Sequence, residues 1–306
     1  MKVAYLIQSH TGVRQVARLA GAVRALDPES WIHVSHDERG AEGIEEAVAA
    51  VPGVHVTRDA GGRGTFHMVR RWLRAVDALR DDGGADFVVV LSGQDYPVRP
   101  LRHMHDDLAA SGDGFVETFP ALTGEGSPWP VREGRSRYLY RWRPLLPLSD
   151  RARDRLHLLH GVNRVQPWLR VNVAYGHLKL GVRHGGIPQG LQCRGGSMFT
   201  SLSWRAVEHV ARTVAERPDV VAWGEGSLCT DEAFFQTVLT GMPDLRVEPS
   251  ARRYFRFDGA RFGHPKVLTT EDVDDALASG DYFARKFDER TDCAALDLID
   301  EALGLR

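Results

Sequence analysis

The sequence predicts an α/β fold built on a mixed, mostly parallel sheet flanked by helices. In the first hundred residues, short apolar runs alternate with longer segments whose apolar residues recur at helical spacing. One run, DFVVVL at residues 86–91, is apolar after its first residue, as expected of a strand covered by helices on both faces. Strands and helices that alternate in this way form a parallel sheet with right-handed crossovers.

The elements of this first part follow from the spacing of apolar residues and from turn signals. Val13, Val16 and Ala20 fall on one face of a helix, and Asp27-Pro28 ends it. The predicted strands are residues 3–7, 31–34, 54–57 and 86–91, and the predicted helices are residues 13–26, 44–51 and 65–79.

The middle of the chain differs in character. From Pro120 to about Pro188 it is rich in Pro, Gly, Trp and Arg, its periodicity is poor, and we expect one or two helices, such as residues 149–160. Excursions of this length are usually lids or binding walls. Beyond it we predict a strand at 197–201, helices at 204–216 (with Ser203 as N-cap), 231–239, 272–277 and 294–303, and strand-like pieces within 245–257.

Composition limits the classes of function. The chain has 306 residues and a formal net charge of -2, which does not favour non-specific binding of nucleic acid. Three cysteines without metal-ligand spacing predict reduced thiols in a cytoplasmic protein. The first apolar run is too short for a signal peptide or a membrane span, and no later stretch is long enough for a span. A cluster of five arginines at positions 132–143 is either a solvated surface or a wall for anionic or polyhydroxyl groups.

Two segments place flexible or polar residues beside strands. LSGQDYP (residues 91–97) follows the apolar strand, at the strand end where open α/β sheets bind ligands, so Gln94 and Asp95 are candidates for a crevice. A turn that Asp95 caps is the alternative. In RGGSMF (residues 194–199), two glycines before a strand let the backbone approach a ligand closely, although a glycine pair by itself is a weak signal.

Two further segments carry charge. In CTDEAFF (residues 229–235), Glu232 lies in the first turn of a predicted helix, where it is either catalytic or an ordinary partner of the helix dipole. In YFARKFD (residues 282–288), aromatic residues flank two cations. These cations either extend from an amphipathic surface or meet a phosphate.

Together and in this order, the segments resemble the Core-2/I-branching N-acetylglucosaminyltransferase and peptide O-xylosyltransferase family, glycosyltransferase family 14. The resemblance runs from Lys2 to about Asp292 and is carried by VAYLIQSH, IHVSHDE, LSGQDYP, GGSMFTSLSWRAV, TDEAFFQTVL, HPKVL and FARKFD. It implies a single GT-A domain over residues 1–306, with a nucleotide-binding half (1–118), an acceptor-side excursion (119–190) and a catalytic half (191–306). It also implies an inverting, metal-independent transfer from a UDP-sugar.

The resemblance assigns roles to individual residues. Glu232 matches the catalytic base, Lys286 matches a cation on the donor diphosphate, and Lys266 falls where some members carry an arginine with that duty. Asp37 falls near the uridine-contacting position, and Glu117 near an acid that contacts the acceptor. We further expect donor contacts from Gln94, Asp95, Gly195, Gly196 and Ser197, and acceptor contacts from Arg137, Tyr138 and Arg141.

The chemistry agrees with one carboxylate and fixed cations. The attacking hydroxyl must lose a proton, which a carboxylate can accept, and the leaving diphosphate needs a metal ion or basic side chains. The strand at 86–91 is followed by Ser-Gly-Gln-Asp rather than by the Asp-x-Asp motif that holds a metal in many GT-A enzymes. Asp272-Val273-Asp274 has that spacing but lies in a predicted helix. We therefore expect no metal and no cofactor.

The acceptor class and two alternative functions stay open. Animal members of the family are anchored in the Golgi, whereas this sequence resembles a soluble bacterial-type member, so we expect a glycan, a lipid-linked sugar or a secondary metabolite as acceptor, with GlcNAc or xylose as the transferred sugar. The alternatives are a nucleotidyltransferase or hydrolase of sugar nucleotides, in which carboxylates would hold Mg²⁺, and a non-catalytic nucleotide-sugar binding module.

Overall fold

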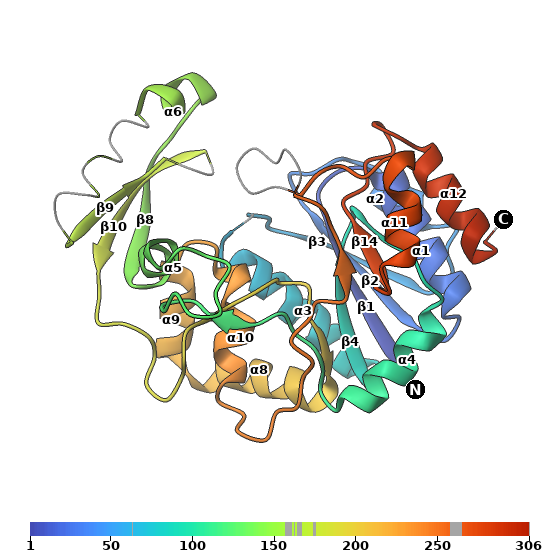
Figure 1. Cartoon of the computed structure of the whole chain (residues 1–306), viewed down its shortest axis with the longest axis horizontal. Helices are drawn as coiled ribbons and strands as arrows, with labels where there is room; N and C mark the ends of the chain where they lie inside the picture. Colours follow the sequence, from blue (N-terminus) through green and yellow to red (C-terminus); the bar gives the residue numbers. More distant parts are fainter. Residues whose placement is uncertain are drawn as a thin grey trace.

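A six-stranded sheet forms the centre of the computed structural model, which describes residues 1–62, 64–156, 161, 163, 167–173, 176–257 and 265–305 (Figure 1). In spatial order its strands are β3 (Val54–Asp59), β2 (Trp31–Asp37), β1 (Val3–Ser9), β4 (Phe87–Ser92), β12 (Ser201–Ser203) and β6 (Gly114–Phe115). The first four strands are parallel, and β12 runs antiparallel to both β4 and β6. The predicted α/β class with a mixed, mostly parallel sheet is confirmed.

The order of the strands fixes where a ligand can bind. The chain leaves β1 toward β2 and β3, then returns to β4 on the other side of β1, so the direction of winding reverses between β1 and β4. In open α/β sheets, ligands bind outside the carboxyl ends of the strands at such a reversal. The segments that follow β1 and β4 therefore lie at the expected binding edge.

Helices cover both faces of this sheet because alternate residues of each strand point to opposite faces. On β1, Tyr5 and Ile7 join one buried cluster and Ala4 and Leu6 the other. The first cluster is covered by α1 (Val13–Leu26), α2 (Ile44–Val48), α4 (Leu101–Ser111), α11 (Val273–Ala278) and α12 (Ala294–Leu303). The second is covered by α3 (His67–Asp81), α8 (Trp204–Glu216), α9 (Pro218–Gly226) and α10 (Phe234–Leu239).

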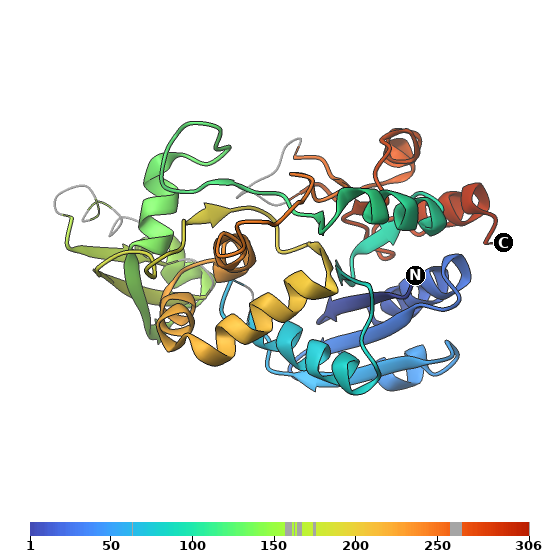
Figure 2. The ribbon, with the colours of Figure 1, turned by 90° about the horizontal axis from the view of Figure 1, so that it is seen from below.

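A second, three-stranded antiparallel sheet forms a lobe at one end of the molecule, and both chain ends lie toward the other end (Figures 1 and 2). Its order is β8 (Tyr140–Pro147), β10 (His177–Arg183) and β9 (Leu169–Asn172), and α5 (Val131–Tyr138) and α6 (Asp150–Leu156) flank β8 in the chain. The sequence prediction missed this sheet, because prolines and arginines interrupt the alternation along β8. As an edge strand, β8 tolerates Pro144 and Pro147.

Several helices begin and end where the sequence predicts them. The bounds of α1, α8 and α12 agree with prediction, and the Ser203 side chain accepts a hydrogen bond from the Ala206 amide as the expected N-cap. The helix predicted at 231–239 is divided into a 3-10 turn, η2 (Thr230–Glu232), and α10. Helices α4, α5 and α9 were not predicted, and residues 157–160 of the predicted helix 149–160 lie outside the described residues.

The strand predicted at 197–201 is wrong. Residues 196–200 form a loop between β11 (Arg194–Gly195), which pairs with β7 (Phe119–Pro120), and β12. Predicted helix 272–277 begins as a 3-10 turn, η4 (Thr270–Asp272), which continues into α11. Asp272 takes part in a capping box with Thr269, so the Asp-x-Asp spacing here is helical, as expected.

Within the described part of the chain, no helix has both the length and the apolar character that crossing a bilayer would require.

Candidate active site

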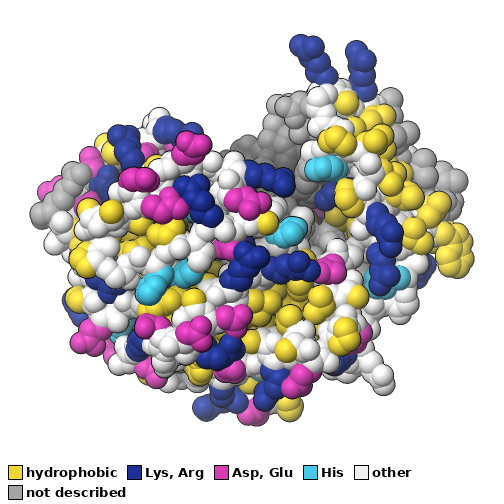
Figure 3. Space-filling model, turned by 180° about the vertical axis from the view of Figure 1, so that it is seen from behind, with side chains coloured by type: hydrophobic (Ala, Val, Ile, Leu, Met, Phe, Trp, Pro, Cys, Tyr) yellow, Lys and Arg dark blue, Asp and Glu magenta, His cyan; other side chains and the backbone are white. Residues whose placement is uncertain are grey.

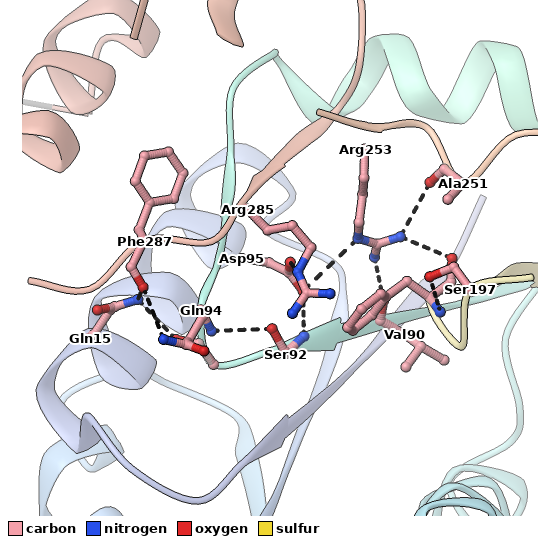
Figure 4. A network of polar contacts seen from close by, with 12 residues as sticks. Gln15, Val90, Ser92, Gln94, Asp95, Ser197, Ala251, Arg253, Arg285 and Phe287 are labelled. Carbon is pink, nitrogen blue, oxygen red and sulfur yellow. Dashed lines mark hydrogen bonds and ion pairs between the residues drawn. The ribbon is translucent and has the colours of Figure 1, made fainter. Parts of the chain in front are cut away.

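The turn after β4 and the segment that contains Lys286 lie side by side. Strand β5 (Asp95–Pro97) pairs antiparallel with β14 (Phe283–Arg285), which pairs in turn with β13 (Arg253–Tyr254). The Gln15 side chain from α1 ties the two segments together, because its Nε2 donates to the carbonyls of Gly93 (3.1 Å) and Phe287 (3.0 Å) (Figure 4). The structure thus joins two motifs that lie far apart in the sequence.

Asp95 is buried between two arginines. Its Oδ1 lies 3.2 Å from Arg285 Nε and its Oδ2 lies 3.9 Å from Arg253 Nε, while Oδ2 also accepts the Ser92 amide (Figure 4). The Asp95 side chain has no exposed surface. The prediction that Asp95 contacts the donor is therefore wrong for this conformation: its charge fixes the arginines, and a ligand cannot reach it.

Arg253 organises the contacts around this carboxylate. Its guanidinium donates to the carbonyls of Phe199 (3.0 Å) and Ala251 (3.2 Å) and to that of Val90 on β4 (Figure 4). Burial lowers the pKa of Arg253 to about 10, an effect that the charge of Asp95 partly opposes. Arg253 was not among the predicted site residues, and its only signal was its place in a strand-like piece that also carries Arg252 and Arg256.

Phe199 connects Arg253 and Arg285 with the glycine loop, that is, residues 194–199, which comprise β11 and the residues that follow it. The Arg285 guanidinium carbon lies 4.1 Å from the centroid of the Phe199 ring, and that of Arg253 lies 4.9 Å away. Cations attract the face of an aromatic ring at such distances. Residues 194–199 are thereby fixed against the segment that carries Lys286.

The other end of the glycine loop lies against the segment that carries Glu232. The Gly196 amide donates to the Glu232 carbonyl (2.9 Å), and Gln236 Nε2 on α10 donates to the Ser197 carbonyl (2.7 Å). All four segments are thus linked by direct contacts, and residues 194–199 contact both the segment that carries Glu232 and the segment that carries Lys286.

The Glu232 carboxylate is held at one oxygen. Arg137 Nη1 on α5 donates to Glu232 Oε2 at 2.7 Å, and Arg137 also pairs with Glu133. The Arg137 guanidinium stacks over Trp129, with 4.7 Å between the guanidinium carbon and the ring centroid. The Glu232 side chain is 39% exposed and that of Arg137 18%, so a well-fixed arginine orients a carboxylate that solvent or substrate can still reach.

A second carboxylate, Glu117, shares this region. Burial raises the pKa of Glu117, the Ser197 amide hydrogen bond opposes that rise, and the nearby charge of Glu232 adds to it. Glu117 therefore lies near Glu232 and beside Ser197, and its contact with the acceptor stays a prediction.

The two glycines of the loop are required by close packing. A Cβ at Gly196 would lie 1.9 Å from the Glu117 carbonyl oxygen, and one at Gly195 would lie 2.5 Å from the Trp129 ring. Real Cβ atoms are not found so close to a backbone oxygen. The loop can therefore pass between Glu117 and Glu232 only without side chains at these positions.

We expect Gly196→Ala to reduce kcat/KM by at least about 10-fold, because displacing the loop misplaces both carboxylates. Steady-state kinetics would measure the loss. Gly185→Ala is the matched control, since a Cβ there would have no neighbour within 4 Å. Equal rates for the two variants would contradict a role for the loop in positioning.

The remaining predicted donor residues occupy different surroundings. Lys266 Nζ lies 2.9 Å from Asp272 Oδ1, and Arg256 lies at the same distance from that oxygen. The Lys266 charge is therefore already paired. Lys286 is half-buried and follows Arg285 in the sequence. The pKa of Asp288 is lowered mainly by its hydrogen bond with Arg290, and the charge of Lys286 makes a smaller contribution in the same direction.

Asp37 lies at the carboxyl end of β2, on the binding edge. Its Oδ1 accepts the Arg39 amide at 2.9 Å, and its carboxylate packs so tightly over Gly61 that a Cβ there would lie 1.4 Å from Oδ2. Gln94 is half-buried in the turn after β4, where its carbonyl accepts the Phe287 amide at 2.9 Å. Both residues lie at this edge of the sheet, and their contacts with the donor stay predictions.

Of the predicted acceptor residues, Tyr138 is buried, so the prediction that it contacts the acceptor is wrong. Its side chain is 0% exposed and its hydroxyl donates to the Cys229 carbonyl (3.2 Å). Tyr138 therefore stabilises the segment that precedes Glu232 and cannot contact an acceptor.

Arg141 is exposed on β8, beside the end of α9 at Gly226. Viewed from behind, the surface is hollowed between the body and the lobe (Figure 3).

A comparison with protein-family models decides the family. The model of the Core-2/I-branching enzyme matches residues 3–278, nearly the whole chain. This chain belongs to the Core-2/I-branching enzyme family. The family assignment makes it a glycosyltransferase. The motif-based resemblance to this family is confirmed.

The other comparisons do not strengthen the assignment to the Core-2/I-branching family. No curated protein matches the chain. Solved structures that resemble it include an active-site mutant of LgtC (13% identity, 92% of this chain and 86% of that one, TM-score 0.42) and mouse xyloside xylosyltransferase 1 (10%, 92% and 97%, 0.38). A structure described as mannose-1-phosphate geranyltransferase from Thermus thermophilus matches at 15% identity over 49% of this chain, which spans about half (47%) of that protein, with a TM-score of 0.28. Because all three TM-scores are below 0.5, we draw no conclusion about fold or function from these structures.

Proposed function

We propose that this protein is an inverting glycosyltransferase that moves a sugar, GlcNAc or xylose, from a UDP-sugar to an acceptor hydroxyl without a metal ion. The observation that carries the proposal is the Glu232 carboxylate, which is oriented by Arg137 and joined through the glycine loop to the cationic segment of Lys286. The family supplies the reaction class, and these contacts support the roles of its residues.

Glu232 acts as the general base in this proposal. The acceptor oxygen attacks the anomeric carbon from the side opposite the leaving group, its proton passes to a Glu232 carboxylate oxygen, and the bond between the sugar and UDP breaks with its electron pair on the diphosphate. Arg137 holds Oε2. The carboxylate can therefore be aimed at a hydroxyl without rotating freely. Such a base typically contributes about 10²–10⁴ in rate.

Fixed cations receive the leaving diphosphate in this proposal. Lys286 supplies the direct contact, and Arg285 and Arg253 keep a positive potential behind it because one carboxylate, Asp95, is shared between the two arginines. Preorganised charge of this kind stabilises a developing anion without reorganisation. Asp95, the carboxylate that follows β4, is committed to these arginines and is not presented as a metal ligand.

The acceptor binds on the lobe side of Glu232. Arg137 lies on α5, directly before β8 of the lobe, and pairs with Glu232, whose charge also affects Glu117. Arg141 is exposed where β8 begins. A carboxylate and guanidinium groups hydrogen-bond the hydroxyls of a sugar in complementary directions. The class of acceptor we propose is a glycan, a lipid-linked sugar or a glycosylated secondary metabolite.

Thermal shift measurements with UDP, UDP-GlcNAc and UDP-xylose, each with and without EDTA, test the donor part of the proposal. A ligand that binds the native state raises the apparent melting temperature. We expect an equal rise with and without EDTA, and a clearly smaller rise for Lys286→Ala. Lys266→Ala is the matched control, since the Lys266 charge is paired with Asp272. A rise that EDTA abolishes would favour a metal-dependent nucleotidyltransferase, and binding without transfer to any acceptor would favour a binding module.

A further inference from the structure

One face of the β8–β10 lobe packs on the body and the other faces solvent. Residues directly opposite each other in paired strands share a face of a sheet. Gly181 pairs with Trp142 of β8, and both are buried. Val182, which follows Gly181 on β10, pairs with Arg141 of β8 and with Leu169 of β9, and all three are exposed. The solvent face therefore combines apolar and basic residues.

Exposed hydrophobic side chains are concentrated on this lobe. Within the described part of the chain, eight large hydrophobic side chains are exposed, and five belong to the lobe. The five are Leu145 (54%), Leu146 (59%), Trp168 (68%), Leu169 (42%) and Val182 (50%). Single exposed hydrophobic residues are ordinary, but a cluster usually marks an interaction surface.

The charge of the lobe is opposite in sign to that of the whole chain. The described residues within 139–185 include eight Lys or Arg and two Asp, a formal charge of +6 in a chain whose net charge is -2. Arg143, Arg151 and Arg183 are exposed on the lobe, and Arg143 and Arg183 lie within two positions of Leu145 and Val182 in the sequence. In Figure 3 the lobe at the upper right shows hydrophobic, basic and histidine side chains, whereas acidic side chains gather on the body.

We propose that this surface, formed by Leu145, Leu146, Trp168, Leu169 and Val182 with the exposed arginines of the lobe, docks the protein on a bilayer that contains anionic lipids. Tryptophan favours the boundary between headgroups and acyl chains, aliphatic side chains enter it, and arginines bind anionic headgroups. Docking on a bilayer is separate from the transfer reaction and does not depend on it.

The charge of the surface favours an anionic bilayer over a second copy of the chain or a polyanionic glycan. A symmetric dimer through the same face would bring two strongly basic surfaces together, which electrostatic repulsion disfavours. A polyanionic glycan would match the arginines but would leave the exposed leucine and valine side chains in water. An anionic bilayer complements both the charge and the apolar residues.

Co-sedimentation with vesicles of phosphatidylcholine alone, or with about 30% phosphatidylglycerol as an example of an anionic lipid, tests the proposal. We expect binding to the anionic vesicles that weakens as salt rises, because headgroup attraction is screened over about 10 Å at roughly 0.1 M salt. Arg143→Glu with Arg183→Glu should weaken binding by at least about 10-fold, since each surface cation contributes about a factor of five. Leu146→Ser with Trp168→Ser should weaken it at every salt concentration.

Two control variants match these changes elsewhere on the surface. Leu298→Ser removes a leucine that is 44% exposed on α12, and Arg14→Glu reverses an arginine that is 84% exposed on α1. Both should bind vesicles like the parent, and circular dichroism and melting temperature should show that all variants are folded. Equal vesicle binding by lobe and control variants, or no binding by the parent, would overturn the proposal. A concentration-dependent dimer that Leu146→Ser with Trp168→Ser disrupts would instead assign the surface to a second copy and would likewise overturn it.

Discussion

Glu232→Gln should lower kcat by about 10²–10⁴ while the stabilisation by UDP-sugar stays within error of the parent. Glutamine keeps the size of the side chain and an oxygen that can accept the Arg137 Nη1 hydrogen bond now 2.7 Å long, but it cannot accept the acceptor proton. Steady-state rates with a competent acceptor, together with donor-induced thermal shifts, separate the loss of a base from the loss of binding.

Glu133→Gln is the matched control for this experiment. Glu133 is the other carboxylate paired with Arg137, four positions earlier on α5, and its side chain is 40% exposed. Its loss changes the charge around Arg137 as much as the loss of Glu232 does, so a catalytic role predicts only a small change in kcat for this variant. Comparable losses in both variants would assign the effect to Arg137 and its charge balance and would exclude Glu232 as the base.

Asp95→Asn should produce the largest loss of stability, about 3–5 kcal/mol of unfolding free energy, because it leaves two buried or half-buried arginines without their shared counter-charge. The Arg253 and Arg285 side chains are 1% and 19% exposed, so solvent cannot replace the carboxylate. The expected fall in melting temperature is roughly 6–15 °C for a chain of this size, measured by calorimetry.

A surface ion pair supplies the comparison. Asp219→Asn removes the partner of Arg217 where the two side chains are 51% and 37% exposed, and exposed pairs contribute about 1 kcal/mol or less. If Asp95→Asn proves no more destabilising than Asp219→Asn, the two arginines are not held by this carboxylate. The same result would exclude the pairing of Asp95 with Arg253 and Arg285 as the means by which the Lys286 segment is positioned.

Part of the fold could be predicted from the sequence because the signals were local. Helices α1 and α8 carry strong apolar periodicity with a clear stop or N-cap, and their observed bounds agree with prediction. The β8–β10 sheet was missed for the opposite reason. Strands β8 and β10 pair across a separation of thirty residues or more, and Pro144 and Pro147 interrupt the alternation in an edge strand that does not need every hydrogen bond.

Some residues of the candidate site could be predicted from the sequence and others could not. Glu232, Lys286, Gly195 and Gly196 could be found from motifs, and the structure links their segments through direct contacts. Arg253 could not be found, because nothing near it in the sequence shows that its guanidinium is buried against Val90 and Phe199.

By itself, the sequence determined the α/β class, the main helices and the family, because periodicity, caps and ordered motifs are written in neighbouring residues. Only the tertiary structure decided which polar side chains face a ligand. Asp95 and Tyr138 have the right chemistry for contact but are buried by residues distant in the sequence, namely Arg253 and Arg285 for the first and the Cys229 segment for the second. Whether a polar group is exposed or buried depends on partners that the folded chain brings together, and local sequence carries no record of them.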